Sequence, residues 1–295
     1  VRTQDVRLVS YVNQGDNRIS VASAGNKNGD FEITFNMDWE VPYSFSFGPQ
    51  AYYSANSKKF NVNAFTAQYI RFTFYHTSSA SGAVDTSQSS VVSSAGWSAD
   101  GAQNAVNLTF ALRNEGRYYG YSITRNSGGQ LVLTIKGKPK SLSGSLIVLD
   151  PGHGGSDGGA VGLNGAVNES VLNFALSAAT KNELEKRGAK VLLTRFDDAD
   201  VTLEERKAYA RAQNADLFVS IHCNASVNTS KFGTAVYYYR PFSMPLAKAI
   251  YEKTAALFAN DFYSSDPSKR SSCGLGAMYN PFSVTRLEEC PSVLV

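Results

Sequence analysis

The sequence has few cysteines, little excess charge and no long apolar run. Its three cysteines, Cys223, Cys273 and Cys290, are too few and too scattered for a disulfide scaffold or a cysteine-based structural zinc site. The formal net charge of +3 is too small a surplus to favour a nucleic acid as partner. Mean hydropathy is −0.23 and no run of about 18 apolar residues occurs, so we expect no membrane span. The chain starts without an initiator Met or a basic-then-apolar leader, which suits a mature or trimmed chain, and at this point a cytosolic origin stays open as well.

What the chain does contain falls into two parts with different patterns. An apolar fraction of 43% in 295 residues is enough for the cores of two ordinary domains. In residues 1–140, short aromatic and β-branched runs alternate with turn residues, which predicts an all-β domain. Its expected strands are 30–35, 69–75, 106–112, 118–124 and 130–135. We expect the serine-rich stretch 78–98 to be a long exposed loop, and 136–145 to contain the domain boundary.

In residues 145–295, buried strands alternate with helices. The expected strands are 146–150, 191–194, 216–221, 233–239 and 292–295. One helix should begin at Glu169 after an Asn168 N-cap, a second should open with a capping box between Thr202 and Glu205, and a third should span 245–260. This alternation predicts an α/β domain with a mainly parallel sheet flanked by helices, preceded by the all-β domain.

Three side chains near the carboxyl ends of these strands could hold a metal ion. His153 follows the first strand on a glycine-rich turn, His222 follows the third, and Glu169 opens the intervening helix. Two imidazoles and one carboxylate are the ligand set of a catalytic zinc site with an open fourth position. Taken singly, each has a simpler explanation, because a strand-end histidine is often structural and an acidic residue suits a helix N-terminus. The turn lacks the glycine and lysine pattern of a phosphate-binding loop.

Four sequence blocks, taken together, resemble the zinc-dependent bacterial N-acetylmuramoyl-L-alanine amidases across essentially all of residues 145–295. The first block is Ile147-Val148-Leu149-Asp150-Pro151-Gly152-His153-Gly154-Gly155, and the second is Glu169 at the start of a helix. The third block contains Thr194, Arg195, Asp198, Val201, Leu203 and Arg206. The fourth block runs from Ala215 to His222 and continues with Asn224 and Ala225. The resemblance implies that His153, Glu169 and His222 bind Zn²⁺, and it makes Asn224 a candidate substrate-binding residue.

The resemblance also implies a reaction and a setting. The family hydrolyses the amide between N-acetylmuramic acid and L-Ala of the peptidoglycan stem peptide. We therefore expect a peptidoglycan or muropeptide substrate, an extracytoplasmic location in a bacterium and, as a possible partner, an activator protein. The all-β part is loosely similar to the envelope-targeting domains that precede such amidases. Its tryptophans, Trp39 and Trp97, would suit stacking on sugar rings, although most aromatic residues there should fill the core.

The proton-transferring carboxylate of the family has no match in this chain. The family carries a Glu on the last strand, and Pro291-Ser292-Val293-Leu294-Val295 matches up to the residue before it. Glu288 and Glu289 do not fit the position, and we expect both to be solvated surface charges. The catalytic residue is therefore unknown from the sequence, and the interpretations are a C-terminally truncated amidase or a zinc-binding pseudo-enzyme.

Two alternative functions stay open. One is a non-catalytic zinc-containing module that binds muropeptide, and the other is a zinc peptidase that cuts within the stem peptide. Among the cysteines, Cys223 should be a buried structural thiol, because on a strand its side chain would point away from His222. Sequence alone leaves open whether Cys273 and Cys290 pair.

Overall fold

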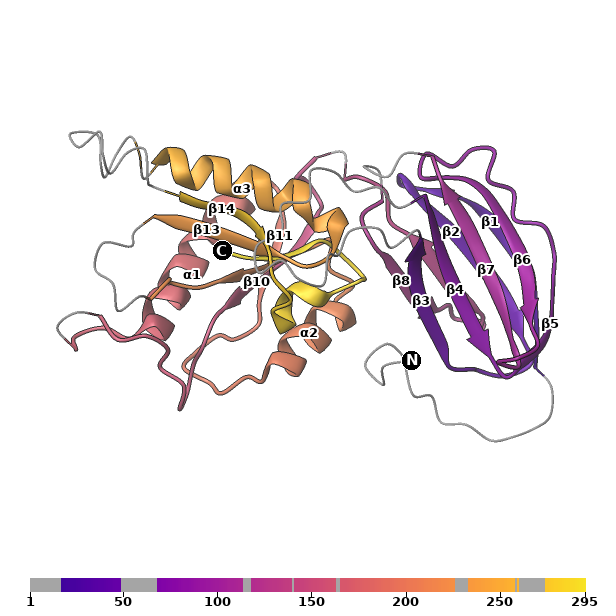
Figure 1. Ribbon diagram of the computed structural model, residues 1–295, viewed down its shortest axis with the longest axis horizontal. Helices are drawn as coiled ribbons and strands as arrows, with labels where there is room; N and C mark the ends of the chain where they lie inside the picture. Colours follow the sequence, from indigo (N-terminus) through magenta and orange to yellow (C-terminus); the bar gives the residue numbers. More distant parts are fainter. Residues whose placement is uncertain are drawn as a thin grey trace. The chain divides into compact units, whose positions relative to one another are not determined.

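The computed structural model describes residues 17–48, 68–113, 118–139, 141–162, 165–225, 233–257, 259 and 274–295. These residues belong to two compact units, which divide along the chain between Lys138 and Pro139 (Figure 1). None of the described helices is long and apolar enough to cross a membrane.

The first unit is built from strands in two sheets. The five-stranded sheet has the order β5-β1-β2-β9-β8, and the four-stranded sheet has the order β3-β4-β7-β6. The strands are β1 Asn17–Lys27, β2 Asp30–Met37, β3 Tyr43–Gly48, β4 Tyr69–Tyr75, β5 Thr77–Ser81, β6 Val92–Asp100, β7 Ala105–Leu112, β8 Tyr121–Arg125 and β9 Leu131–Ile135. Alternate residues face the core, as Ile33 on β2 and its partner Leu133 on β9 do, both fully buried.

The predicted loop at 78–98 is wrong over part of its length. β5 pairs with β1, and β6 pairs along its length with β7. Both are edge strands, whose backbone pairing needs no large side chains, so their serine and alanine content hid them from a reading based on apolar alternation. Part of the predicted boundary also belongs to the first unit, because Lys136 is buried and donates its backbone N–H to the Gly120 carbonyl.

The second unit is a six-stranded sheet with helices packed on it. The strand order is β11-β10-β12-β15-β13-β14, with four parallel pairs and one antiparallel pair, between β13 and β15. Its elements are β10 Leu146–Pro151, α1 Glu169–Lys186, β11 Lys190–Leu193, α2 Leu203–Ala212, β12 Leu217–Ile221, β13 Thr234–Tyr238, α3 Met244–Leu257, β14 Gly274–Tyr279 and β15 Ser292–Leu294, with 3₁₀ turns η3 Pro241–Ser243 and η5 Ser283–Arg286. The predicted strands and helices are present, while β14 and the 3₁₀ turns were not predicted.

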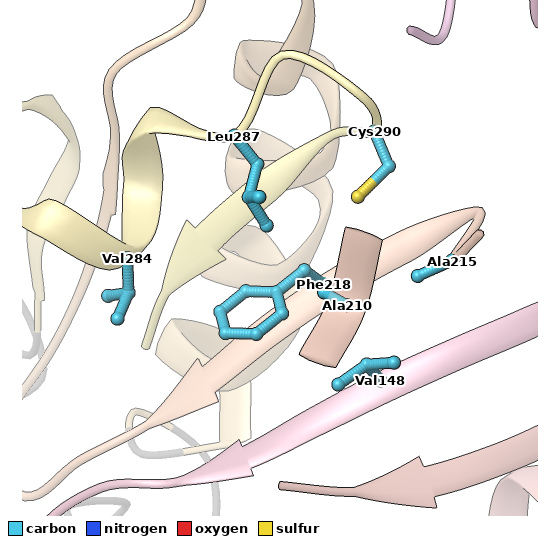
Figure 2. Close-up of a cluster of buried hydrophobic side chains, with 7 residues drawn as sticks. All are labelled: Val148, Ala210, Ala215, Phe218, Val284, Leu287 and Cys290. Carbon is cyan, nitrogen blue, oxygen red and sulfur yellow. The ribbon is translucent and has the colours of Figure 1, made fainter. Parts of the chain in front are cut away.

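Alternate side chains of β10 enter two hydrophobic clusters. Ile147 and Leu149 pack with Phe174 and Leu184 of α1. Val148 lies between them in sequence and joins the cluster that Figure 2 shows. That cluster contains Val148, Ala210, Ala215, Phe218, Val284, Leu287 and Cys290. Helices α1 and α2 therefore contribute to different clusters, and side chains of β10 contact both helices.

The fully buried side chains of helix α1 are polar, while several of its apolar side chains are exposed. Its buried residues are Glu169, Ser170, Asn173 and Ser177. In contrast, Leu172 and Leu176 are 48% and 54% exposed. An ordinary surface helix shows the reverse pattern. The polar face of α1 is therefore part of a polar site rather than of the core alone.

Candidate metal centre

His153 lies on the loop that leaves β10 and holds an unusual backbone conformation. Its φ is +60°, in the left-handed region that non-glycine residues rarely adopt. The preceding residue, Gly152, donates its N–H to the Ile221 carbonyl at 2.9 Å, which ties the loop to the end of β12. The loop therefore carries the His153 ring to the strand end that also precedes His222.

Glu169 is the first residue of α1, and its carboxylate is held by neighbours on three segments. Oε2 accepts from the Ala160 N–H at 3.0 Å, and Oε1 accepts from the Cys223 N–H at 2.9 Å. The amide of Asn173, one turn along α1, lies 3.4 Å from Oε1. Burial alone would raise the pKa of Glu169, but these hydrogen bonds and the nearby His153 outweigh it and lower the pKa. The carboxylate is therefore ionised, as a metal ligand must be.

His222 follows β12, and its Nδ1 lies 3.0 Å from Oε1 of Glu169. Burial is the main reason that the pKa of His222 is lowered, with the neighbouring His153 adding to the effect against the attraction of Glu169. The ring packs against Gly152 so closely that a Cβ there would lie 2.3 Å from Nε2. The imidazole is therefore neutral near pH 7, with Nδ1 directed at the carboxylate.

The structure brings His153, Glu169 and His222 together. One ligand atom from each can be chosen so that all lie within 4.8 Å of one another, and the two imidazole rings are 4.8 Å apart. Nε2 of His153 is 3.3 Å from Oε1 of Glu169. Tetrahedral ligands at zinc bond lengths of about 2.0–2.2 Å lie ~3.4 Å apart, so the donor types and the distances of 3.3 and 3.0 Å from Glu169 to the two histidines fit a zinc ion.

A second carboxylate, not predicted from the sequence, fixes the orientation of His153. Nδ1 of His153 lies 2.8 Å from Oδ2 of Asp157, four residues along the loop. The hydrogen bond to His153 and another from the Gly159 N–H lower the pKa of Asp157. An ionised carboxylate can only accept, so Nδ1 of His153 donates to Asp157, and Nε2 is the ring nitrogen that faces Glu169. A carboxylate behind a histidine ligand is a common arrangement at zinc sites.

The strand-face argument for Cys223 is wrong. Cys223 is exposed, and its Sγ lies 3.6 Å from Oδ1 of Asn173 on α1, beside the metal-binding side chains. The alternation of side chains does not extend to this position, because β12 ends at Ile221 and both His222 and Cys223 follow it.

The prediction for Glu288 and Glu289 is also wrong, because both are in partly buried ion pairs. Glu289 pairs with Arg211 on α2, and Glu288 pairs with Arg240. Their side chains are 23% and 15% exposed, so neither is a solvated surface charge. Both carboxylates pair with arginines, and neither pair includes one of the three candidate ligands.

The remaining predictions concern the residues around the site and the cysteine pair. Asn224 follows the site and is exposed, and its role in substrate binding stays a prediction. Cys273 lies outside the described residues, while Cys290 is buried in the cluster of Figure 2. Val295 lies beside the site, since its carbonyl accepts from the His222 N–H at 3.0 Å.

Comparison with known proteins identifies the second unit. The family model for N-acetylmuramoyl-L-alanine amidase (Amidase_3) matches residues 147–295, half of the chain. The uncharacterized protein YqiI of Bacillus subtilis is 37% identical over 153 residues, which cover 52% of this chain and 69% of YqiI. The amidase AmiC of Neisseria meningitidis is 45% identical over 92 residues, which cover 31% of this chain and 22% of AmiC.

A solved structure is also similar. The catalytic domain of CwlV, an N-acetylmuramoyl-L-alanine amidase from Paenibacillus polymyxa, is 32% identical with a TM-score of 0.40, and the match covers 51% of this chain and 78% of that one. The matched segment thus spans only part of each relative's length. The match of the family model over half of the sequence shows that this chain belongs to the N-acetylmuramoyl-L-alanine amidase family.

Proposed function

We propose that this protein is a zinc-dependent peptidoglycan hydrolase that cleaves the amide between N-acetylmuramic acid and L-Ala of the stem peptide. The observation that carries the proposal is the convergence of His153, Glu169 and His222, within 4.8 Å, in a chain of the amidase family. The family match covers only residues 147–295, and we propose the activity for the whole protein.

The residues of the site have separate tasks in this reaction. Zinc, when bound, polarises the carbonyl of the scissile amide and activates water. His153, Glu169 and His222 would hold the ion, and Asp157 keeps the proton on Nδ1 of His153. Glu169 is buried while both histidines are about a quarter exposed, so a substrate can approach from the histidine side. The carboxylate is shielded there from competing water.

The family's proton-transferring Glu would directly follow Val295, and the register of the sheet supports that position. Ser220 of β12 pairs with Leu294 of the parallel strand β15. The pairing continues past the end of β12, because the Val295 N–H donates to the Ser220 carbonyl and the His222 N–H donates to the Val295 carbonyl. A residue after Val295 would therefore lie opposite His222. A carboxylate there could take a proton from water and give it to the leaving amine.

The proposed setting follows from the same activity. Peptidoglycan is outside the cytoplasmic membrane, so we place the protein extracytoplasmically, and an activator protein as partner belongs to the proposal. The first unit would target the enzyme to the cell wall. In its support, Asn36, Trp39, Glu40, Arg125 and Gln130 line a hollow of about 360 Å³, and aromatic and polar side chains in one hollow suit a sugar ligand.

The test of the activity uses purified muropeptides and mass spectrometry. Three forms are compared: the 295-residue chain, the chain extended after Val295 by Glu, and the chain extended by Gln. We expect release of the intact stem peptide, with the Glu extension faster than the Gln extension by about 10²- to 10⁴-fold, the range of general acid–base catalysis. His153→Ala should abolish bound zinc and cleavage, while His76→Ala, a histidine of the first unit, should change neither.

Other outcomes of this test support the alternatives. Products cut within the stem peptide would identify a zinc peptidase of different specificity. Zinc-dependent binding of muropeptide without any cleavage in the three forms would identify a binding module. Full zinc retention by His153→Ala would remove the proposed ligand set.

A further inference from the structure

Three successive carbonyl groups, from Pro151 at the end of β10 to His153 on the loop, accept hydrogen bonds from side-chain donors. Arg206 donates from Nη1 to the Pro151 carbonyl at 2.7 Å and from Nη2 to the His153 carbonyl at 2.8 Å. Arg195 donates from Nε to the Pro151 carbonyl at 3.1 Å and from Nη2 to the Gly152 carbonyl at 3.3 Å. We call Arg195 and Arg206 the arginine clamp. The arginine clamp holds the carbonyl groups of Pro151, Gly152 and His153 in fixed directions.

The two arginines of the clamp are buried, at 3% and 4% exposure, which is costly for a charged group unless its donors are used. Arg206 meets this cost through Asp150, whose Oδ1 lies 2.7 Å from Nη1, and through the Val201 carbonyl at 2.9 Å from Nε. Four of its five N–H groups are therefore engaged, given the two loop carbonyls. The buried, planar guanidinium of Arg206 can make these hydrogen bonds in one orientation only, so it fixes the positions of the carbonyl groups that it bonds.

The loop needs such a restraint at His153. Its φ of +60° lies in the left-handed region, which is strained for a non-glycine residue and persists only where the surroundings hold it. Arg206 bonds the carbonyl of this strained residue itself. The bond therefore stabilises the backbone conformation that the structure shows at His153.

Arg195 extends the restraint to a second ligand. The Nη2 that bonds the Gly152 carbonyl also donates to the Ser170 carbonyl at 2.7 Å, and Ser170 follows Glu169 on α1. One guanidinium therefore joins the loop that carries His153 to the helix that carries Glu169. This side chain therefore helps to fix the distance between two of the three candidate ligands.

We propose that Arg195 and Arg206 are positioning residues that preorganise the metal site, so that their guanidinium geometry, and not only their charge, sets the affinity for zinc. The proposal rests on the proposed zinc-binding function and deepens it. Neither arginine touches the ion or the substrate; both act through the backbone at His153 and Glu169. A lysine at either position keeps the charge but cannot bond two carbonyls at once with the same geometry.

The test compares Arg206→Lys with Arg211→Lys in the full chain. Arg211 lies on the same helix, α2, and its Nε bonds Glu289 rather than the metal loop, so its substitution is the matched control. Zinc affinity is measured by competition with a chromophoric chelator, and the visible spectrum of the cobalt-substituted protein reports ligand geometry. The thermal midpoint of the metal-free protein reports structural damage separately. Arg195→Lys is the second variant.

We expect Arg206→Lys and Arg195→Lys to weaken zinc binding by about 10- to 100-fold, the usual effect of losing a group that orients a metal ligand. The control should stay within about twofold of the original protein, as its pair lies away from the site. Unchanged zinc affinity in both clamp variants would overturn the inference, and so would loss of the metal-free fold in both. Failure of the original protein to bind zinc would instead overturn the proposed function.

Discussion

At the scale of single residues, the metal centre depends on two positions that carry no side chain. A Cβ on Gly152 would lie 2.3 Å from the His222 ring. A Cβ on Gly159 would lie 2.6 Å from Cδ2 of His153 and 2.8 Å from Cβ of Glu169. Glycine at both positions lets the backbone lie close to the side chains of His153, Glu169 and His222, and this close approach allows the three side chains to converge.

Replacing Gly159 with Ala should separate the ligands. The added methyl group would collide with both His153 and Glu169, and the φ of +70° adds backbone strain. We expect zinc affinity to fall by at least about tenfold, as for other changes that disturb ligand orientation. Gly144→Ala is the control, because Gly144 has a similar φ of +82° but nothing within 4 Å of its Cβ position. Equal zinc affinity in the two variants, measured by chelator competition, would contradict this reading of Gly159.

The pKa values of the ligands predict how the metal-free protein responds to pH. The pKa of His222 is lowered by burial, so below its ordinary value of 6.5 the unfolded chain takes up a proton that the folded protein does not. The stability of the metal-free protein should therefore decrease as pH falls below about 6.5. The lowered pKa of Glu169 has the same sign, with its effect beginning below about 4.5.

The measurement is the free energy of unfolding in urea at pH 7.5 and pH 5.5, with zinc removed by chelator. His222→Gln should lose part of the difference between the two pH values, since glutamine does not titrate. If the original protein is equally stable at both pH values, the lowered pKa of His222 does not control its stability in this range.

The residues that sequence reasoning could and could not identify differ in how they act. His153, Glu169 and His222 offer donor atoms at strand ends and at a helix start, positions that a linear pattern reveals, and the structure brings them together. Asp157 acts through His153, and its signal, a carboxylate four residues after a histidine, has no meaning until the loop folds back. Cys223 was misjudged because strand alternation was applied beyond the end of β12.

At the scale of elements, one buried carboxylate connects four of them. Asp150 at the end of β10 accepts from Arg206 of α2, from Thr194 after β11 and from Ser220 of β12. It is fully buried. Because these elements carry the loop to His153, Asp150 is a structural anchor close to the site and not one of the three candidate ligands.

Asp150→Asn should destabilise the second unit strongly. The substitution leaves the buried guanidinium of Arg206 without its counter-charge, and removal of one partner of a buried pair costs about 3–5 kcal/mol. Glu183→Gln is the comparison, because the Lys186–Glu183 pair on α1 is exposed on both sides and such pairs contribute ~0.3–0.5 kcal/mol. Chemical denaturation monitored for the second unit measures both. A cost for Asp150→Asn as small as that for Glu183→Gln would show that the pair is not an anchor.

Elements with strong local signals were predictable and those formed by tertiary contacts were not. The capping box at Thr202 and Glu205 defines the start of α2, and both reciprocal hydrogen bonds are present. The edge strands β5 and β6 contain mainly small side chains and depend on pairing with β1 and β7. Helix α1 was predicted from its ends, while its polar inner face could be explained only once Glu169 and Asn173 were seen at the metal centre.

At the scale of the whole molecule, the two units carry different features. The described part of the second unit holds the candidate metal site, and the first unit offers the hollow beside Trp39. Only the second unit matches the family model, at residues 147–295. If the units have separate roles, a change in the hollow should alter attachment to the cell wall and leave the metal centre intact.

Trp39→Ala should therefore weaken binding of the full chain to isolated peptidoglycan without lowering its zinc content. Loss of an aromatic contact is worth about 0.5–1.5 kcal/mol beyond the buried area, so we expect the affinity to fall by up to about tenfold in a sedimentation assay. Trp97→Phe is the control, because Trp97 packs against Phe35 and Phe74 and phenylalanine keeps an aromatic ring there. To separate wall attachment from binding at the active site, the assay is repeated with zinc removed. A Trp39→Ala protein that sediments with peptidoglycan as fully as the Trp97→Phe protein would exclude the hollow as the attachment site, whatever the activity of the metal centre.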